Sequence, residues 1–350
     1  MSYNFIFFCQ SLAKGGAERV IISLAERLNR DGYGVKIVTR KRVDEEYLLP
    51  DGIDRVTLDE KGFFAEVKAL RRECKNFDCD VLVSFLNLFH GLFATFGLKT
   101  KNVVSVRCDP NKMYRGKKRF LIKALLPFAD GCLFQTTEQA EFFPKKLRKK
   151  SVVIANPVGD EYFFVERAPE PNTVVSIGRL TDQKNHALTV RAFSKVVKNR
   201  PAAKLYIYGE GEKQRELVDL IKEEGLQDNV FLMGLTSDVT GVLAKAEVFV
   251  MASEFEGIPN AMLEAMAAGV PIVSTDFEGG GLPLLSEGGK NCVVVPRGDV
   301  DDMANAVIRL LSDKKEREKY SQNAKSRARS FGSDVIFGRW LEYFKEVIKK

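Results

Sequence analysis

Two glutamates lie close together in a segment that follows a short apolar run. The segment Ser253–Pro271 reads SEFEGIPNAMLEAMAAGVP, and seven residues separate Glu256 from Glu264. Pro259 suits the first position of a helix that we expect over residues 260–268. Free N–H groups at a helix start favour phosphate oxygens, and carboxylates accept hydrogen bonds from hydroxyls. The segment is typical of a site for an elongated, polyhydroxylated phosphate ester. The alternative is one helix-capping acid and one solvated acid.

Two cations follow another predicted strand. The segment Ile177–Lys184 reads IGRLTDQK, so a strand ending at Gly178 places Arg179 and Lys184 at its carboxyl end. Open α/β sheets bind ligands at that end. An arginine fork and a lysine point charge together suit a diphosphate, although two ordinary surface cations would give the same pattern.

A glycine pair marks a third candidate loop. The segment Gln10–Arg19 reads QSLAKGGAER, with Gly15 and Gly16 just before a helix predicted from about Ala17. Glycines let the backbone approach a ligand, and the helix start favours an anion. The segment matches neither GxGxxG nor the P-loop pattern, and an ordinary strand–helix turn is the alternative.

Short apolar runs alternating with amphipathic stretches set the fold class. The pattern predicts α/β architecture with parallel sheets, because such runs are typical of strands buried on both faces. Twelve runs favour two six-stranded halves over one (β/α)₈ barrel, with an irregular, proline-containing boundary at about 156–171. The predicted strands are Phe5–Cys9, Val35–Thr39, Val81–Phe85, Val103–Val106, Cys132–Gln135, Val152–Ile154, Val174–Ile177, Leu205–Tyr208, Val230–Met233, Val248–Met251, Pro271–Thr275 and Cys292–Val295.

Composition excludes several classes of protein. With 350 residues, 45% hydrophobic and 29% charged, the chain can bury sizeable cores, which rules out a disordered or fibrous protein. No apolar run approaches the ~20 residues that span a bilayer, and no secretory signal is recognisable. Six cysteines without metal-site spacing indicate reduced thiols.

Positive charge is concentrated in one region. Residues 101–150 hold thirteen Lys or Arg against four Asp or Glu, whereas the whole chain carries +7. Within it, Lys112–Phe128 (KMYRGKKRFLIKALLPF) predicts a basic amphipathic helix lying on an anionic bilayer. Nucleic-acid binding is the competing use of such charge, but no RRM, KH or helix-turn-helix pattern supports it. A solvated helix is the plainer alternative. The cations concerned are Lys112, Arg115, Lys117, Lys118 and Arg119.

The ordered set of motifs resembles that of retaining glycosyltransferase family 4. Glu256-x7-Glu264 looks like the family's E-x7-E signature. The segment IGRLTDQK resembles the family's GRLxxxKG segment, and QSLAKGGAER resembles its N-terminal Gly-Gly loop. YGEGE at 208–212 and MGLT at 233–236 fall where the family has further glycine segments. The resemblance runs nearly end to end. It implies the GT-B fold: two facing Rossmann-like domains, with the last helix crossing back to the first domain. The expected domains are an acceptor-binding domain at 1–160, joined by the aromatic helix at 333–350, and a nucleotide-sugar domain at 161–332.

The same resemblance implies residue roles. Arg179 and Lys184 would bind the donor diphosphate, and Glu264 the ribose hydroxyls. Glu256 and the backbone of 257–260 would hold the transferred sugar and its phosphate. Gly15 and Gly16 would approach the diphosphate from the other domain, and the backbone near Gly209 and Leu235 would frame a base, most simply uracil. The implied donor-binding set includes Gly257, Ile258, Pro259 and Asn260.

Three positions depart from the family's pattern. Arg107 stands where many relatives have a histidine, and an arginine cannot serve as a base at neutral pH, so it is expected only to bind phosphate. Asn185 stands where the family usually has glycine, and no role follows for the adjacent His186. Glu210 replaces the usual aspartate of the GDG segment. Asp78-Cys79-Asp80 matches a DxD metal motif, but it precedes a strand, so Asp80 is expected to be a strand-entry residue.

The resemblance implies a retaining hexosyltransferase that moves a hexose or N-acetylhexosamine from a UDP-sugar to a polyprenyl-diphosphate-linked glycan in bacterial surface-glycan or glycoprotein-glycan assembly. We expect no cofactor, no metal and no nucleic-acid partner. The expected location is cytoplasmic, peripheral to the inner face of the cell membrane. Two alternatives remain: a non-catalytic GT-B partner subunit that binds nucleotide sugars, and a peripheral membrane or nucleic-acid-binding α/β protein.

Overall fold

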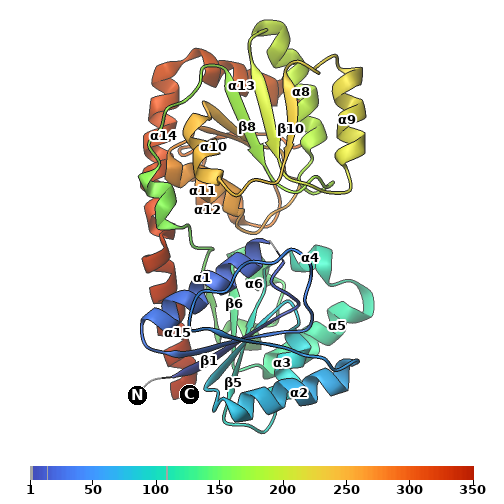
Figure 1. The fold of residues 1–350 in the computed structure, drawn as a ribbon, viewed down its shortest axis with the longest axis vertical. Coiled ribbons are helices and arrows are strands. Elements are labelled where there is room, and N and C mark those ends of the chain that lie inside the picture. The colour runs from blue at the N-terminus through green and yellow to red at the C-terminus, as the bar shows by residue number, and fades with distance from the viewer. Residues whose placement is uncertain (1–2, 14, 108) are drawn as a thin grey trace. The chain divides into compact units, whose positions relative to one another are not determined.

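The protein consists of two compact α/β units, shown in Figure 1. The structure is a computed structural model that describes residues 3–13, 15–107 and 109–350. The first unit comprises Met1–Pro157 and Asp334–Lys350, and the second comprises Val158–Ser333. The paired strands in both sheets are parallel, and helices connect most of the successive strands, which confirms the predicted fold class.

The first sheet contains seven strands in the described part of the chain, in the order β3-β2-β1-β4-β5-β6-β7. Its strands are β1 (Asn4–Cys9), β2 (Gly34–Thr39), β3 (Asp54–Thr57), β4 (Val81–Phe85), β5 (Lys101–Ser105), β6 (Gly131–Phe134) and β7 (Ser151–Val153). Its helices are α1 (Gly16–Arg30), α2 (Phe63–Asn76), α3 (Leu88–Thr95), α4 (Pro110–Met113), α5 (Gly116–Leu125), η1 (Leu126–Phe128), α6 (Thr137–Glu141), α7 (Lys145–Arg148) and α15 (Ser333–Lys349).

Strand β3 was not predicted, so the expectation of six strands in this half was wrong. Its sequence, DRVT, contains no apolar run because β3 lies at the sheet edge and is largely half-exposed. Period-2 burial is therefore too weak there to mark a strand.

Alternate residues of β1 bury opposite faces of the first sheet. Ile6 and Phe8 join a core cluster that includes residues of α2 and α3, whereas the ring of Phe5 lies 5.3 Å from that of Phe344 on α15. The Tyr343 hydroxyl of α15 accepts a hydrogen bond from the Cys132 N–H at 2.8 Å. The aromatic C-terminal helix thus packs on the first unit, as predicted (Figure 1).

The second sheet has six strands in the described residues, in the order β10-β9-β8-β11-β12-β13. Its strands are β8 (Thr173–Ile177), β9 (Lys204–Tyr208), β10 (Val230–Gly234), β11 (Val248–Met251), β12 (Ile272–Thr275) and β13 (Val293–Val295). Its helices are η2 (Asp160–Phe164), α8 (His186–Asn199), α9 (Gln214–Glu223), α10 (Val239–Lys245), α11 (Asn260–Ala268), α12 (Gly281–Ser286), α13 (Val300–Ser312), α14 (Lys314–Ala328) and η3 (Arg329–Phe331).

The strand order gives each sheet one point where the chain reverses its direction of winding. In the first sheet that point lies between β1 and β4, and in the second it lies between β8 and β11. Open parallel sheets bind ligands beyond the carboxyl ends of the strands at this switch point. The loops that follow these four strands are therefore the expected positions of a ligand site.

Candidate functional site

Two loops of the second unit meet at its switch point. The loop after β8 carries Arg179 and Lys184, and the loop after β11 carries Glu256. Lys184 Nζ lies 2.5 Å from Glu256 Oε1, and the Ser253 hydroxyl donates to the same carboxylate oxygen at 3.0 Å. The sheet thus brings together residues that are far apart in the sequence, and it forms an ion pair from two of the predicted catalytic side chains.

The residues beside this ion pair fasten the two loops to each other. The Gln183 carbonyl accepts from the Glu254 N–H at 2.8 Å, and the Gln183 side-chain amide donates to the Phe255 carbonyl at 2.8 Å. On the other side of Lys184, Asn185 Nδ2 donates to Glu254 Oε1 at 2.7 Å. Because hydrogen bonds flank the pair on both sides, the lysine and the glutamate are held in place before any ligand arrives.

Asn185 also fixes the start of α8. Its backbone is in the left-handed region, with φ 45°, and its Oδ1 accepts from the Leu188 N–H at 3.2 Å as an N-cap. Glycine takes this backbone conformation without strain, and asparagine is the residue next best suited to it. The sequence alone gave no role to Asn185, although its departure from the family's glycine was the available signal.

His186 supports the strand end behind the loop. Its Nε2 lies 3.2 Å from the Gly178 carbonyl and its Nδ1 lies 3.4 Å from the Ser176 hydroxyl. The side chain is buried, and that burial lowers the imidazole pKa to about 4. The ring is therefore neutral at physiological pH, with Nε2–H donating to the carbonyl, and it acts in packing and positioning.

The glycines of the predicted base-binding region allow loops to pack closely. A Cβ added at Gly209, whose φ is +143°, would lie 2.0 Å from the Gly178 carbonyl oxygen. The Gly209 N–H donates to the Gly234 carbonyl at 2.8 Å, which brings the loop after β9 beside the end of β10. The next residue, Leu235, is 54% exposed. Gly209 and Leu235 therefore lie in adjoining loops, with an apolar side chain available to a flat ligand.

Helix α11 begins at Asn260 and carries Glu264, which is buried. Pro259 is its N-cap residue, with ψ 120°, so its predicted place inside the first turn was wrong by one position. Two backbone hydrogen bonds hold the loop before it. The Glu256 N–H donates to the Glu278 carbonyl, and the Glu278 N–H donates to the Glu254 carbonyl. Gly257 and Ile258 complete this loop, and Ile258 is buried.

The predicted first-unit residues lie at the carboxyl end of β1 and β5. Gly15 is the N-cap residue of α1 and Gly16 is its first residue, while Lys14 lies outside the described residues. Arg107 follows β5, and its guanidinium donates to the Ser105 hydroxyl at 2.8 Å and to Asn156 Oδ1 at 2.6 Å.

The Arg107 side chain packs against aromatic rings of the first unit. Its guanidinium carbon lies 4.8 Å from the centroid of the Trp340 ring and 5.5 Å from that of Phe85, and burial lowers its pKa to about 9. Its Nη2 is buried with no hydrogen-bond partner in the described part of the chain. The side chain thus ties β5 to the C-terminal helix, and a role in phosphate binding remains a prediction.

The basic segment is broken in two. Helix α4 ends at Met113 and α5 begins at Gly116, so the single helix predicted over 112–128 was wrong; the break coincides with a positive φ of 54° at Gly116. Phe120 and Leu121 are 74% and 45% exposed, beside three exposed cations in the first turn of α5. Exposed cations and exposed apolar side chains are therefore adjacent in the sequence of α5. The exposed cations are Lys117, Lys118 and Arg119, preceded by Lys112 and Arg115.

Among residues 3–13, 15–107 and 109–350 no group of three His, Cys, Asp or Glu side chains could hold a metal ion. No described helix combines the length and the apolar character that crossing a bilayer requires. Asp80 of the DxD sequence accepts from the Asn4 N–H at 2.8 Å, so it anchors the start of β1 as expected of a strand-entry residue.

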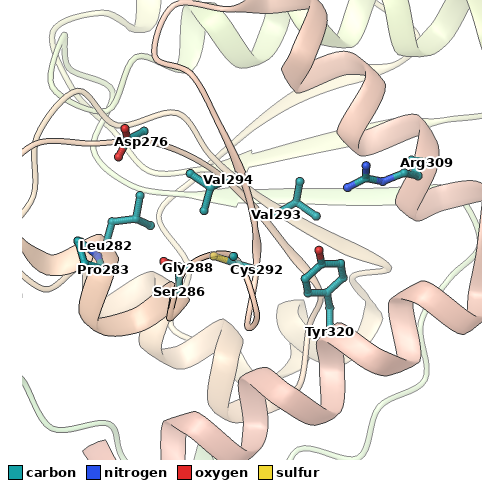
Figure 2. Close-up of a pocket in the computed structure, with 11 residues that line it drawn as sticks. Asp276, Leu282, Pro283, Ser286, Gly288, Cys292, Val293, Val294, Arg309 and Tyr320 are labelled. Atoms are coloured by element: carbon teal, nitrogen blue, oxygen red, sulfur yellow. The ribbon is translucent and has the colours of Figure 1, made fainter.

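A cavity of about 490 Å³ lies in the second unit (Figure 2). Leu282, Cys292, Val293, Arg309 and Tyr320 are among the residues around it. None of the predicted site residues lines it, and Arg309 is already paired with Glu316 at 3.2 Å. This cavity is therefore lined by residues other than those of the predicted donor site.

Two family descriptions match successive parts of the sequence. "Glycosyltransferase Family 4" matches residues 14–162, and "Glycosyl transferases group 1" matches residues 159–327. A relative from Campylobacter jejuni, the N-acetylgalactosamine-N,N'-diacetylbacillosaminyl-diphospho-undecaprenol 4-alpha-N-acetylgalactosaminyltransferase, is 29% identical over 362 residues, covering 96% of this chain and 98% of that protein. A second C. jejuni relative, named as an alpha-1,4-N-acetyl-D-galactosaminyltransferase acting on a GalNAc-containing diNAcBac-PP-undecaprenol, is 27% identical over 97% of this chain.

Solved structures share the fold. A glycosyltransferase from Rickettsia africae superposes with a TM-score of 0.83 at 17% identity over 100% of this chain and 99% of that chain. Anabaena HepE in complex with UDP gives a TM-score of 0.83 at 18% identity over 98% of this chain and 100% of that chain. At such identities the likeness concerns the fold.

Proposed function

Because the chain belongs to glycosyltransferase family 4 and has its GT-B fold, we propose that it is a retaining hexosyltransferase that uses a UDP-sugar. The acceptor would be a polyprenyl-diphosphate-linked glycan in bacterial surface-glycan or glycoprotein-glycan assembly. The observation that carries this proposal is the Lys184–Glu256 ion pair at the switch point of the second sheet.

The donor would lie along the carboxyl end of that sheet. Lys184 and the exposed Arg179 supply positive charge for the diphosphate, and the start of α11 supplies backbone N–H groups. Glu264 would accept hydrogen bonds from the ribose, and Gly209 and Leu235 would frame the base. The UDP bound to HepE, a structural neighbour, supports uridine as the nucleoside.

Glu256 would change partner when the donor binds. Without ligand its carboxylate holds Lys184, and Ser253 donates to the same oxygen. A diphosphate carries more negative charge than a carboxylate, so it would compete for the lysine and free Glu256 to accept hydroxyl groups of the sugar. The loops stay in register during this exchange because the Gln183 and Asn185 contacts do not involve Lys184.

Catalysis would then be electrostatic and positional. The bond between the anomeric carbon and the β-phosphate oxygen breaks, and the acceptor oxygen bonds to that carbon on the same face of the sugar. The proton of the acceptor hydroxyl passes to the departing phosphate oxygen, while Arg179 and Lys184 stabilise the negative charge of the diphosphate. No separate protein base is needed in this scheme.

The acceptor would be reached at a membrane. The C. jejuni relatives are named for undecaprenyl-diphosphate-linked substrates, which supports an acceptor of that class. Phe120 and Leu121 beside the cations of α5 provide the apolar area and charge with which a peripheral protein holds an anionic leaflet. We therefore propose association with the inner face of the cell membrane and no nucleic-acid partner.

A donor and acceptor panel tests the proposal. Purified protein is incubated with UDP-hexoses and UDP-N-acetylhexosamines and with undecaprenyl-diphosphate-linked mono- to trisaccharides. We expect transfer from at least one donor, with the product's anomeric configuration, read by NMR coupling constants, matching that of the donor. Inversion would refute a retaining mechanism. UDP binding without transfer or donor hydrolysis would favour a non-catalytic partner subunit, and absence of UDP binding would reject the donor site.

A further inference from the structure

An apolar groove lies in the first unit, at the amino end of its sheet. It measures about 490 Å³ and is lined by residues of α3, α5 and η1 and by the segment 97–102. Lys101 is the first residue of β5 and Asp130 directly precedes β6, so the groove lies opposite to the loops that follow these strands. It is therefore separate from the switch point, where open α/β sheets bind ligands. We call it the α3–η1 groove.

Three phenylalanines of this groove are exposed. Phe96 is 80% exposed, Phe128 68% and Phe93 44%. Phe93 belongs to α3, Phe96 is its C-cap residue and Phe128 belongs to η1, and these two elements pack against each other. Exposed apolar side chains that gather around one hollow mark a place where a protein meets another apolar surface. The other apolar lining residues, all partly buried, are Leu92, Leu98 and Leu125.

The backbone that presents Phe96 is fixed by hydrogen bonds. Arg71 Nη1 of α2 donates to the Ala94 carbonyl at 3.0 Å and to the Phe96 carbonyl at 2.6 Å. The Leu98 N–H donates to the Thr95 carbonyl at 2.8 Å. These bonds satisfy carbonyls at the end of α3, which have no partner within the helix. The exposed ring is thus held at the surface by the fold, and the groove is formed before any ligand arrives.

The charge around the groove is mainly positive. Lys99 and Lys101 line it, and neither forms an ion pair with another residue that the structure describes. Lys146 Nζ lies 5.1 Å from the centroid of the Phe128 ring. Among the described lining residues Asp130 is the one acid, and its carboxylate accepts from a backbone N–H of β5 at 2.8 Å. An anionic group beside the groove would therefore meet lysines whose charge is not already matched.

This combination of surfaces suits a lipid better than a sugar or a nucleotide. The uncharged polar side chains that line the groove, Thr95, Thr100 and Asn102, are all buried. A sugar would find few exposed hydrogen-bond partners there and would lose those it makes with water. An acyl chain would remove the phenylalanine rings from water, and a phosphate attached to it would be attracted by the lysines.

The position of the groove favours a membrane phospholipid over the chain of a lipid-linked acceptor. The reacting sugar of an acceptor must meet the donor, and Gly15 and Gly16, which are predicted to approach the donor diphosphate, follow β1 at the carboxyl end of the sheet. The groove lies at the amino end, about 15 Å away along a five-residue strand. A phospholipid has no such constraint, because it only has to lie in the same bilayer.

We propose that the α3–η1 groove takes one acyl chain of an anionic phospholipid, whose phosphate is attracted by Lys99, Lys101 and Lys146. The last residue of α5 lines the groove, so this site would extend the surface that α5 is proposed to lay on the membrane. A single chain held in the groove would fix how the first unit is oriented on the bilayer. The proposal goes beyond the transfer reaction and does not depend on it, because lipid binding is measured without donor or acceptor.

Short-chain phosphatidylglycerol tests the groove without a bilayer. Calorimetry on the whole chain compares the dihexanoyl and dioctanoyl lipids below their micellar concentrations. Each methylene that enters an apolar site strengthens binding about fourfold, so two more on the entering chain should lower Kd about 15-fold. Dioctanoyl phosphatidylcholine has the same chains without net charge and should bind several-fold more weakly. Equal Kd values for the two chain lengths would overturn the proposal.

Substitutions locate the binding site. Phe96→Ser and Phe128→Ser remove apolar area at exposed positions without adding charge, and together they should weaken binding of the dioctanoyl lipid at least tenfold. Phe164→Ser, at a position equally exposed at 80% in the second unit, is the matched control and should bind as the wild-type protein does. Unaltered binding in the double variant, with an unfolding temperature like that of the wild-type protein, would contradict the assignment to this groove.

A tryptophan probe separates a lipid from a second copy of this chain. The fluorescence of Phe128→Trp should be quenched by vesicles of phosphatidylglycerol with brominated acyl chains, whereas that of Phe164→Trp should not; Trp340 is buried and gives a constant background. Sedimentation velocity without lipid should give the same oligomeric state for the wild-type protein and Phe96→Ser. A dimer that Phe96→Ser dissociates would assign the groove to a second copy and overturn the proposal. Failure to transfer sugar would leave all these readouts unchanged.

Discussion

Lys184 Nζ lies 2.5 Å from Glu256 Oε1, although the two residues belong to loops that follow different strands. Both side chains are largely withdrawn from solvent, with exposed fractions of 15% and 11%. A ligand diphosphate would therefore meet a lysine that is already oriented and partly desolvated, which strengthens its attraction to developing negative charge.

Removing either cation should slow turnover strongly. Lys184→Ala and Arg179→Ala each delete charge that stabilises the departing diphosphate, and we expect a loss of about 2–4 kcal/mol in transition-state stabilisation. Lys195→Ala, which removes an exposed lysine paired with Asp301 on the surface, is the control. Steady-state kinetics and thermal unfolding measure both effects. Near-wild-type turnover in both site variants would show that the diphosphate binds elsewhere.

The hydrogen bond between Asn185 and Glu254 should appear as a coupling free energy in a double-mutant cycle. Asn185→Asp replaces the donor to Glu254 with a second carboxylate, so we expect lower kcat and weaker UDP binding. Adding Glu254→Gln restores a donor–acceptor pair with reversed polarity and should recover most of the loss. A double-mutant cycle on kcat/KM should give a coupling of about 1–2 kcal/mol. Additive effects of the two substitutions would mean that this contact does not position Lys184.

Stability should depend on pH through His186. Its folded pKa of about 4 lies below the ordinary value of 6.5, so the unfolded chain binds the proton first as pH falls. The contribution that the neutral His186 ring makes to the free energy of unfolding is therefore fully present above pH 6.5. It is lost progressively as pH falls toward 4. His186→Gln keeps a donor for the Gly178 carbonyl and does not titrate. Urea unfolding at pH 7 and pH 5 should therefore show a smaller pH effect in the variant, and an equal effect would exclude His186 as the cause.

Activity should not require a divalent metal. The donor site as proposed offers cations and backbone N–H groups to the diphosphate, so no metal bridge is needed. We expect UDP binding and transfer to persist in excess EDTA. Complete loss of transfer that Mg²⁺ or Mn²⁺ restores would refute this expectation.

Charge and apolar surface on α5 should act together in membrane binding. Changing Lys117, Lys118 and Arg119 to Glu should release the protein from anionic vesicles, because each cation near the leaflet contributes about 1 kcal/mol. UDP affinity should not change. High salt should mimic the substitution only partly, since the exposed Phe120 and Leu121 would still enter the interface.

A charge-matched control separates this surface from net charge alone. Changing Lys314, Lys315 and Lys319, which are exposed on α14, to Glu alters the net charge by the same amount. This control should co-sediment with anionic liposomes as the wild-type protein does. Equal release of both triple variants would attribute binding to overall charge and reject α5 as the contact surface.

The sequence by itself determined the fold class and the positions of most strands. All twelve predicted strands are present. Most of them are central strands, and strands buried on both faces are continuous apolar runs that can be recognised in the sequence. Helix α11 likewise spans the predicted residues 260–268, since a proline before it and Gly269 after it mark its ends. Features that depend on burial of consecutive residues can therefore be predicted from the local sequence.

Tertiary structure decided what depends on neighbours distant in sequence. The edge strand β3 is defined by its pairing with β2, and its own four residues carry no apolar signal. The hydrogen bonds from Asn185 to Glu254 and from Arg40 to Gln10 join residues far apart along the chain. Arg107 was predicted from the sequence as a phosphate-binding candidate. In the structure its guanidinium packs against Trp340, a contact that forms only when the C-terminal helix folds onto the first unit. Such contacts have no local pattern, because strand order and helix packing create them.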